Sequence, residues 1–236
     1  MRWLSAAQSH CGNVRSHNED AVFAAADSGL WVVADGMCGH NAGEYASDPI
    51  TRSLAEVTLT NDLAACIDAI EDRLLEVNDH LRQHARSECN GGTVGSTVVV
   101  LIERDGLAAV LWAGDSRLYR MRNDSVELIT RDHSPVGDLY DSGGITAEEL
   151  LANDTNVVTR AVGGQRELHL DVAVFDVEAE DTLLLCSDGL YREVEVPLMQ
   201  EAMSMEVNSA VDLLMGEVLA GTAKDNVSLV VARAQA

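Results

Sequence analysis

The chain has 236 residues, of which 47% are hydrophobic and only 4% aromatic, so it can bury one sizeable, mainly aliphatic core. It carries 16 basic and 39 acidic residues, a formal net charge of -23, which argues against nucleic acid as a partner because phosphate backbones are repelled. No apolar stretch approaches the roughly 18 residues of a membrane span, and the first residues lack a secretory signal. We therefore expect a single domain over residues 1–236, cytoplasmic, with no nucleic-acid or membrane partner.

Short apolar runs bounded by turn residues predict strands. They cover residues 21–26, 30–34, 97–103, 107–113, 118–122, 126–129, 170–176, 182–186 and 227–233. Several are apolar on both faces, as in strands buried between two layers. Asp105 and Gly106 separate two of these runs and predict a two-residue hairpin turn.

Helices are predicted from apolar stripes. The clearest stripe predicts a long helix over about 62–86, and it consists of Leu63, Ile67, Ile70, Leu74, Val77 and Leu81. Further helices are expected over 42–58, 198–203 and 209–219. The order of elements lacks regular βαβ alternation and favours an α+β fold, a four-layer α-β-β-α sandwich of two antiparallel β-sheets flanked by helices.

Residues 130–166 form a polar stretch interrupted by glycines, with one short helical piece at 147–152. Long irregular segments in compact domains are often functional, and we interpret this one as a mobile flap.

Acidic residues stand where the predicted strands begin or end. They are Glu19, Asp20, Asp35, Asp115, Asp188 and Asp225. One Asp-Gly pair after a strand is commonly only a turn, but the whole set predicts a cluster if these strand ends converge. Clustered carboxylates require protons or a cation, and oxygen ligands select hard ions such as Mg²⁺, Mn²⁺ or Ca²⁺. Arg15 precedes Glu19 by four residues, and its planar guanidinium would suit a phosphoryl group beside such a site.

At these residues the sequence resembles the PPM family, the metal-dependent Ser/Thr protein phosphatases of the type 2C class. The similar segments follow the family's order along nearly the whole chain. They are Arg15-Ser16-His17-Asn18-Glu19-Asp20, Val33-Ala34-Asp35-Gly36-Met37-Cys38-Gly39-His40, Gly95-Ser96-Thr97, Trp112-Ala113-Gly114-Asp115-Ser116-Arg117, Asp132-His133-Ser134, Val158-Thr159-Arg160-Ala161-Val162-Gly163, Ser187-Asp188-Gly189 and Lys224-Asp225-Asn226-Val227. The family's α-β-β-α sandwich agrees with the fold predicted above.

The resemblance implies a centre that holds two Mn²⁺ or Mg²⁺ ions. In it, Asp35 bridges both ions, and Asp188 and Asp225 are ligands of the first. Asp115 and Asp188 together would hold the third, weaker ion of bacterial members.

The resemblance also implies the shell of the second ion, formed by Glu19, Asp20 and the carbonyl of Gly36, in part through water. Arg15 would clamp the substrate phosphate. A hydroxide bridged by the two ions would attack phosphorus in line, with Arg15 and Asp35 as the catalytic residues. The implied partners are phosphorylated proteins, including a Ser/Thr kinase and its substrates. We expect a bacterial enzyme that is monomeric. Some family members of this size are paired with type VI secretion.

Two positions depart from the family pattern. Cys38 replaces a common glycine, and Met37 stands where eukaryotic relatives carry a histidine proposed as the general acid. The proton donor to the leaving group is therefore unassigned, with metal-bound water and His40 as candidates.

Three other readings stay open at this stage. Cys186 and Arg192 match the Cys-x₅-Arg pattern of cysteine-dependent phosphatases, although Asp188 inside that loop would repel a phosphate dianion. A non-catalytic pseudophosphatase that only binds partners is a second alternative, and a Ca²⁺-binding structural domain is a third. The cysteines are five in number, widely spaced and without a Cys-x-x-Cys pair, which argues against a disulfide framework or structural zinc.

Overall fold

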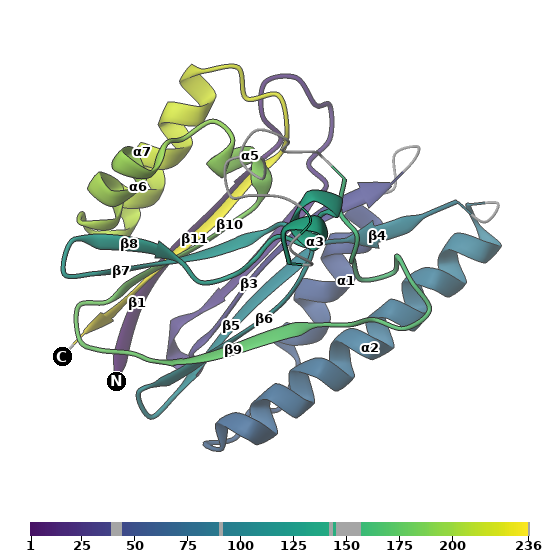
Figure 1. Cartoon of the computed structure of the whole chain (residues 1–236), viewed down its shortest axis with the longest axis horizontal. Coiled ribbons are helices and arrows are strands. Elements are labelled where there is room, and N and C mark those ends of the chain that lie inside the picture. Colours follow the sequence, from purple (N-terminus) through teal and green to yellow (C-terminus); the bar gives the residue numbers. More distant parts are fainter. Residues whose placement is uncertain (39–43, 90–91, 142–143, 145–156, 236) are drawn as a thin grey trace.

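The computed structural model describes residues 1–38, 44–89, 92–141, 144 and 157–235, which form two antiparallel sheets packed face to face with helices outside each (Figure 1). The predicted α-β-β-α sandwich is confirmed. None of the helices in these described ranges has the length and apolar content needed to cross a bilayer.

The first sheet has the strand order β1-β11-β10-β7-β8. Its strands are β1 (Arg2–His10), β7 (Arg117–Arg122), β8 (Ser125–Leu128), β10 (Thr182–Cys186) and β11 (Val227–Gln235). The second sheet has the order β2-β3-β5-β6-β9, and β4 pairs with the far end of β3. Its strands are β2 (Asp20–Ala25), β3 (Leu30–Cys38), β4 (Val94–Ser96), β5 (Val98–Arg104), β6 (Leu107–Ala113) and β9 (Asp171–Asp176).

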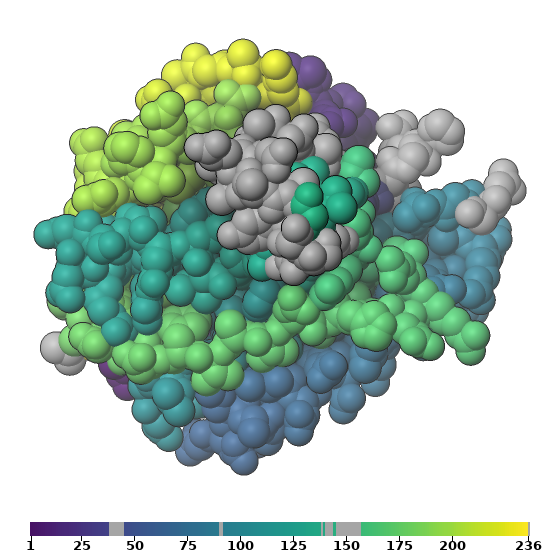
Figure 2. Space-filling view, viewed as in Figure 1, coloured from purple at the N-terminus to yellow at the C-terminus, as the bar shows by residue number. Residues whose placement is uncertain are grey.

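Helices α1 (Glu44–Ala55) and α2 (Leu63–Ser87) cover the second sheet, and α6 (Val196–Met203) and α7 (Val207–Ala220) cover the first. In the space-filling view, the yellow-green pair α6 and α7 and the blue α2 lie at opposite margins of the molecule (Figure 2). Three short helical elements complete the described chain: η1 (Ala26–Ser28), α3 (Pro135–Asp141) and α5 (Asp188–Tyr191).

Apolar side chains fill all three spaces between the layers. The stripe predicted on α2 faces the second sheet, where Ile70, Leu74 and Leu81 are fully buried. Between the sheets, Trp3 of β1 packs edge-on against Trp31 of β3, with ring centroids 4.9 Å apart. Both faces of the central strands are thus buried, as the continuous apolar runs predicted.

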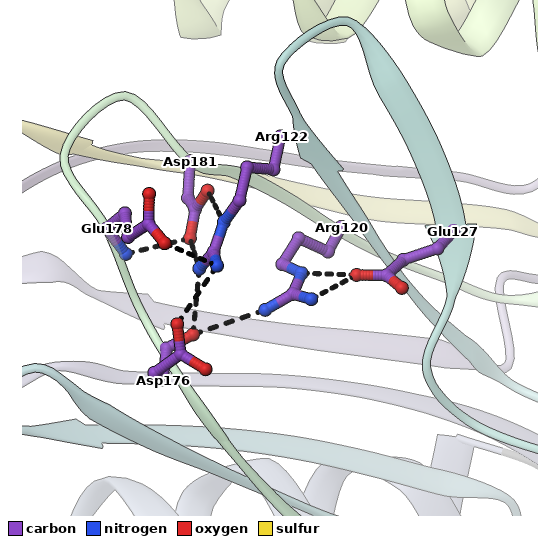
Figure 3. A network of polar contacts seen from close by, with 6 residues as sticks. All are labelled: Arg120, Arg122, Glu127, Asp176, Glu178 and Asp181. Carbon is purple, nitrogen blue, oxygen red and sulfur yellow. Dashed lines mark hydrogen bonds and ion pairs between the residues drawn. The ribbon is translucent and has the colours of Figure 1, made fainter.

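A network of charged side chains joins β7 and β8 to the end of β9 and the segment that follows it (Figure 3). Arg122 of β7 donates two hydrogen bonds, of 2.8 and 2.6 Å, to the buried carboxylate of Asp181. It also reaches Asp176 at the end of β9, at 2.9 Å, and Glu178, at 2.8 Å. The neighbouring Arg120 pairs with Glu127 of β8. Because β7 and β9 belong to different sheets, Arg122 ties the two sheets together.

The predicted strands and helices are found with ends shifted by a few residues. Asp105 and Gly106 form the predicted hairpin turn between β5 and β6, with φ values of 52° and 84°. Strands β1 and β4 and the short helices α3 and α5 were not predicted. The helical piece expected at 147–152 lies outside the described residues.

Candidate active site

The acidic residues gather at one end of the sandwich because of strand pairing. Asp20 of β2 lies directly opposite Asp35 of β3 in an antiparallel pair, so their side chains are cross-strand neighbours. In the other sheet, Asp188 follows β10, while Asp225 precedes β11 and Asp115 precedes β7. Since β10 is antiparallel to both of those strands, its end meets their beginnings.

A cavity of about 260 Å³ opens at this end. It is lined by Arg15, Glu19, Asp35, Gly36, Met37, Thr97, Asp115, Val158, Asp188, Asp225 and Asn226. All the predicted site residues except Asp20 therefore line one cavity, and Asp20 lies buried beside it.

The electrostatics show how closely these carboxylates approach. The pKa of Asp35 is raised well above its ordinary value, first by burial and then by repulsion from Asp20, Asp188, Asp115 and Asp225. Four other acids thus act on one carboxyl group, and a bound cation would relieve this repulsion.

Two further carboxyl groups are poised to lose a proton near neutral pH. Burial, opposed by hydrogen bonds that include one from Ser187, raises the pKa of Asp20 to about 7. Burial together with the charge of Asp188 raises the pKa of Asp115 to about 7. The Ser187 hydroxyl donates to one oxygen of Asp20 at 2.9 Å, while the other oxygen is buried without a hydrogen-bond partner. An orphaned carboxylate oxygen among mutually repelling acids fits a site for hard divalent cations.

Arginines hold two of the carboxylates. Arg15 donates to Asp225 at 2.9 Å, and Arg192 donates from Nε to Asp188 at 3.0 Å. The pKa of Asp188 is raised by burial and by Asp225, against the lowering effect of Arg192. With these carboxylates turned to arginines, no three acids, histidines or cysteines of the described ranges form a ready-made ligand set.

Asn226 joins the segments that carry Glu19 and Asp225. Its side-chain oxygen accepts from the Glu19 amide at 2.8 Å, and its Nδ2 donates to the carbonyls of Cys11, at 3.0 Å, and His17, at 2.9 Å. The Glu19 carbonyl in turn accepts from the Gly36 amide at 3.0 Å. This chain of bonds fixes Gly36, in β3, beside the loop of Arg15.

Known proteins are similar to this chain over most of its length. Residues 8–222 match the family described as Protein phosphatase 2C. The chain belongs to the protein phosphatase 2C family. The serine/threonine phosphatase stp of Listeria innocua is 32% identical over 228 residues, covering 92% of this chain and 90% of the relative.

Solved structures are also similar to this chain. The structure of PppA, titled a key regulatory component of T6SS in Pseudomonas aeruginosa, has a TM-score of 0.89 at 41% identity and covers 99% of this chain and 98% of its own. The catalytic domain of PstP, in complex with 2 manganese ions, has a TM-score of 0.87 at 32% identity and covers 100% of this chain and 99% of its own. The predicted family and its Mn²⁺ or Mg²⁺ cofactors are confirmed, while the assignment of each side chain to a particular ion stays a prediction.

Some residues that shape this 2C site had no predicted role. Ser187, Asn226 and Thr97 belong to the family motifs without an expected role of their own, yet each touches a predicted ligand or its backbone. Thr97, for example, donates from its amide to the Asp35 carbonyl at 2.9 Å and accepts from the Asp35 amide at 3.2 Å. Their position in the sequence could have indicated a role, since each adjoins an acidic residue or lies within a family motif.

The structure excludes the cysteine-dependent alternative. Cys186 is fully buried in β10, and burial raises the pKa of its thiol to about 12, so a nucleophilic thiolate is not available. His40, the candidate proton donor, lies outside the described residues.

Proposed function

We propose that this chain is a metal-dependent phosphatase of phosphoserine and phosphothreonine in proteins, and that it opposes a bacterial Ser/Thr kinase. The observation that carries the proposal is one cavity in which the carboxylates of Asp35, Asp188 and Asp225 meet the guanidinium of Arg15. A pseudophosphatase would not need this complete set, so the catalytic reading is favoured.

Two bound Mn²⁺ or Mg²⁺ ions would activate water as the nucleophile and offset charge on the phosphoryl oxygens. Asp35 would be the ligand shared by both ions, because its charge acts together with those of Asp20 in its own sheet and of Asp188 and Asp225 in the other. The Gly36 carbonyl and Glu19, fixed by the Asn226 bonds, would complete the ligand set on the side of the second sheet.

Arg15 supplies the recognition of phosphate. Its side chain is 54% exposed at the cavity, and its bond to Asp225 holds it there before a substrate arrives. A planar guanidinium donates two parallel hydrogen bonds to a phosphoryl group, which orients the group for in-line attack. In a chain with a net charge of -23, this local cation directs a phosphorylated residue to the cavity.

The test is phosphate release from a phosphothreonine peptide by the purified chain. We expect turnover with Mn²⁺, none with EDTA, and a large loss for Arg15→Ala. Arg52→Ala is the matched control, because Arg52 is 80% exposed on α1 and its ion pair is with Asp48 of the same helix. Bound Mn²⁺ without any phosphate release from several phosphopeptides would favour the pseudophosphatase instead.

The cellular setting is part of the proposal. Similarity to PppA supports a role in regulating type VI secretion, and the kinase of that system and its substrates are the partners to test first. We further propose that the protein acts in the cytoplasm as a monomer. Phosphoproteomics of a deletion strain would identify the substrates.

A further inference from the structure

Arg192 lies between two carboxylates that were predicted to hold a third metal ion. Its Nε is 3.0 Å from Oδ2 of Asp188, and its Nη2 is 3.9 Å from Oδ2 of Asp115. The Asp115 and Asp188 side chains are only 10% and 15% exposed, and that of Arg192 is 26% exposed. The Arg192 guanidinium thus lies within reach of both Asp115 and Asp188, where the family resemblance implies a third metal ion.

The chain holds this guanidinium in place through its local structure. Asp188 is the first residue of α5 and Arg192 is the residue that caps its end, so the two side chains stand four residues apart on one helical turn. The Arg192 amide also donates to the Asp188 carbonyl at 3.1 Å. Its guanidinium carbon lies 5.8 Å from the ring centroid of Tyr191, which belongs to the same turn.

The Tyr191 ring is itself fixed from the other side. Arg117 stacks over it at 3.6 Å and donates two hydrogen bonds, of 2.9 and 2.6 Å, to Asp132. The turn that carries Arg192 is therefore anchored through Tyr191, which limits how far the guanidinium can move away from the pair.

The charge of Arg192 acts on both acids. Its guanidinium lies within ion-pair distance of both carboxylates, so its positive charge offsets the repulsion between them. Offsetting the repulsion between these two carboxylates is what an ion bound between them would do.

Arg15 makes a different kind of contact with Asp225. Arg15 comes from a loop far away in sequence and is 54% exposed, so it can leave Asp225 for a phosphate. Arg192 belongs to the same turn as its partner and has half that exposure. The two arginines therefore serve different purposes at one cavity.

We propose that Arg192 is the built-in cation of the Asp115 and Asp188 pair, so that the chain binds two divalent ions at this cavity and excludes a third. The proposal rests on the metal site of the proposed function and specifies how many ions that site takes. Arg192 is then a positioning residue, which holds one oxygen of Asp188 and leaves the other for the first ion.

The experiment counts bound Mn²⁺ by equilibrium dialysis, with electron paramagnetic resonance to measure free Mn²⁺. We expect two ions for the wild type and a third, weaker one for Arg192→Gln, since the freed carboxylates regain a cation site. Arg120→Ala is the control, because Arg120 pairs with Glu127 away from the cavity, and it should bind two. Three ions in the wild type, or two in Arg192→Gln, would overturn the proposal.

A second variant covers the case in which Arg192→Gln does not fold. Asp115→Asn in the wild-type background should leave the count at two, because no ion depends on Asp115. A loss of one ion in Asp115→Asn would show that Asp115 is a ligand and overturn the proposal. A wild-type count below two would instead defeat the two-ion site itself, which separates that failure from a failure at Arg192.

Discussion

Without bound metal, this protein should become more stable as the pH falls from about 8 to about 5.5. Acids that are stabilised by salt bridges show the opposite pH dependence, because they lose their stabilising charge on protonation. Asp20 and Asp115 have folded pKa values of about 7, against an ordinary value of 3.8. A carboxyl group with a raised folded pKa contributes stability that is complete below the unfolded pKa and is lost as the pH rises through the folded pKa. The stability contributed by these two groups therefore decreases as the pH rises from about 4 to about 7.

The size of the effect follows from the same values. Between about pH 8 and about pH 5.5, each of the two groups takes up roughly one proton in the folded state only, which integrates to about 2 kcal/mol per group. The pair together gives at most about 4 kcal/mol, which shifts Tm by roughly 8–16 °C for a chain of this size.

The assay is thermal unfolding followed by circular dichroism in EDTA across this pH range. Asp115→Asn should reduce the slope, because it deletes one of the carboxyl groups whose folded pKa is raised. Saturating Mn²⁺ should reverse the trend, because protons then compete with the ions for the same carboxylates. A Tm in EDTA that is flat or falls as the pH drops would refute the reasoning.

Further predictions concern single side chains and the choice of inhibitor. Asp35→Asn and Asp188→Asn should each lower turnover on a phosphothreonine peptide with Mn²⁺ by a factor on the order of 10² or more while circular dichroism stays unchanged; near-normal rates would reject their assignments. Arg122→Ala should cost about 3 kcal/mol of unfolding free energy in urea, because it leaves the buried Asp181 carboxylate without its bidentate partner, and a cost below about 1 kcal/mol would contradict that role. Activity should be abolished by EDTA and should survive iodoacetamide, since Cys186 is buried, and the reverse pattern would contradict the metal chemistry.

The sandwich could be predicted because its central strands are almost wholly apolar. The run 182–186 has every side chain buried, and such a run can lie only between two layers. Strand β1 was missed because its burial is partial after Trp3, so that its sequence of small and polar residues shows no clear alternation. Its place is decided by pairing with β11 along its whole length, which is a tertiary contact.

The sequence was enough to predict which acidic residues form the site, but not the contacts that those residues make. Positions such as Asp35 and Asp188 stand out because they end apolar runs. The contacts of Arg192 could not be predicted, because they depend on α5, a four-residue helix too short to show any periodicity. The same holds for the Ser187 hydroxyl on Asp20, which joins residues from two different sheets.

The convergence of carboxylates on bound metal can be observed directly in crystals grown with Mn²⁺, by anomalous scattering at the manganese edge. We predict two peaks in the cavity, both contacted by Asp35, with Asp188 and Asp225 on one of them. A map with no manganese in the cavity, or with an ion that touches none of these three aspartates, would contradict the account.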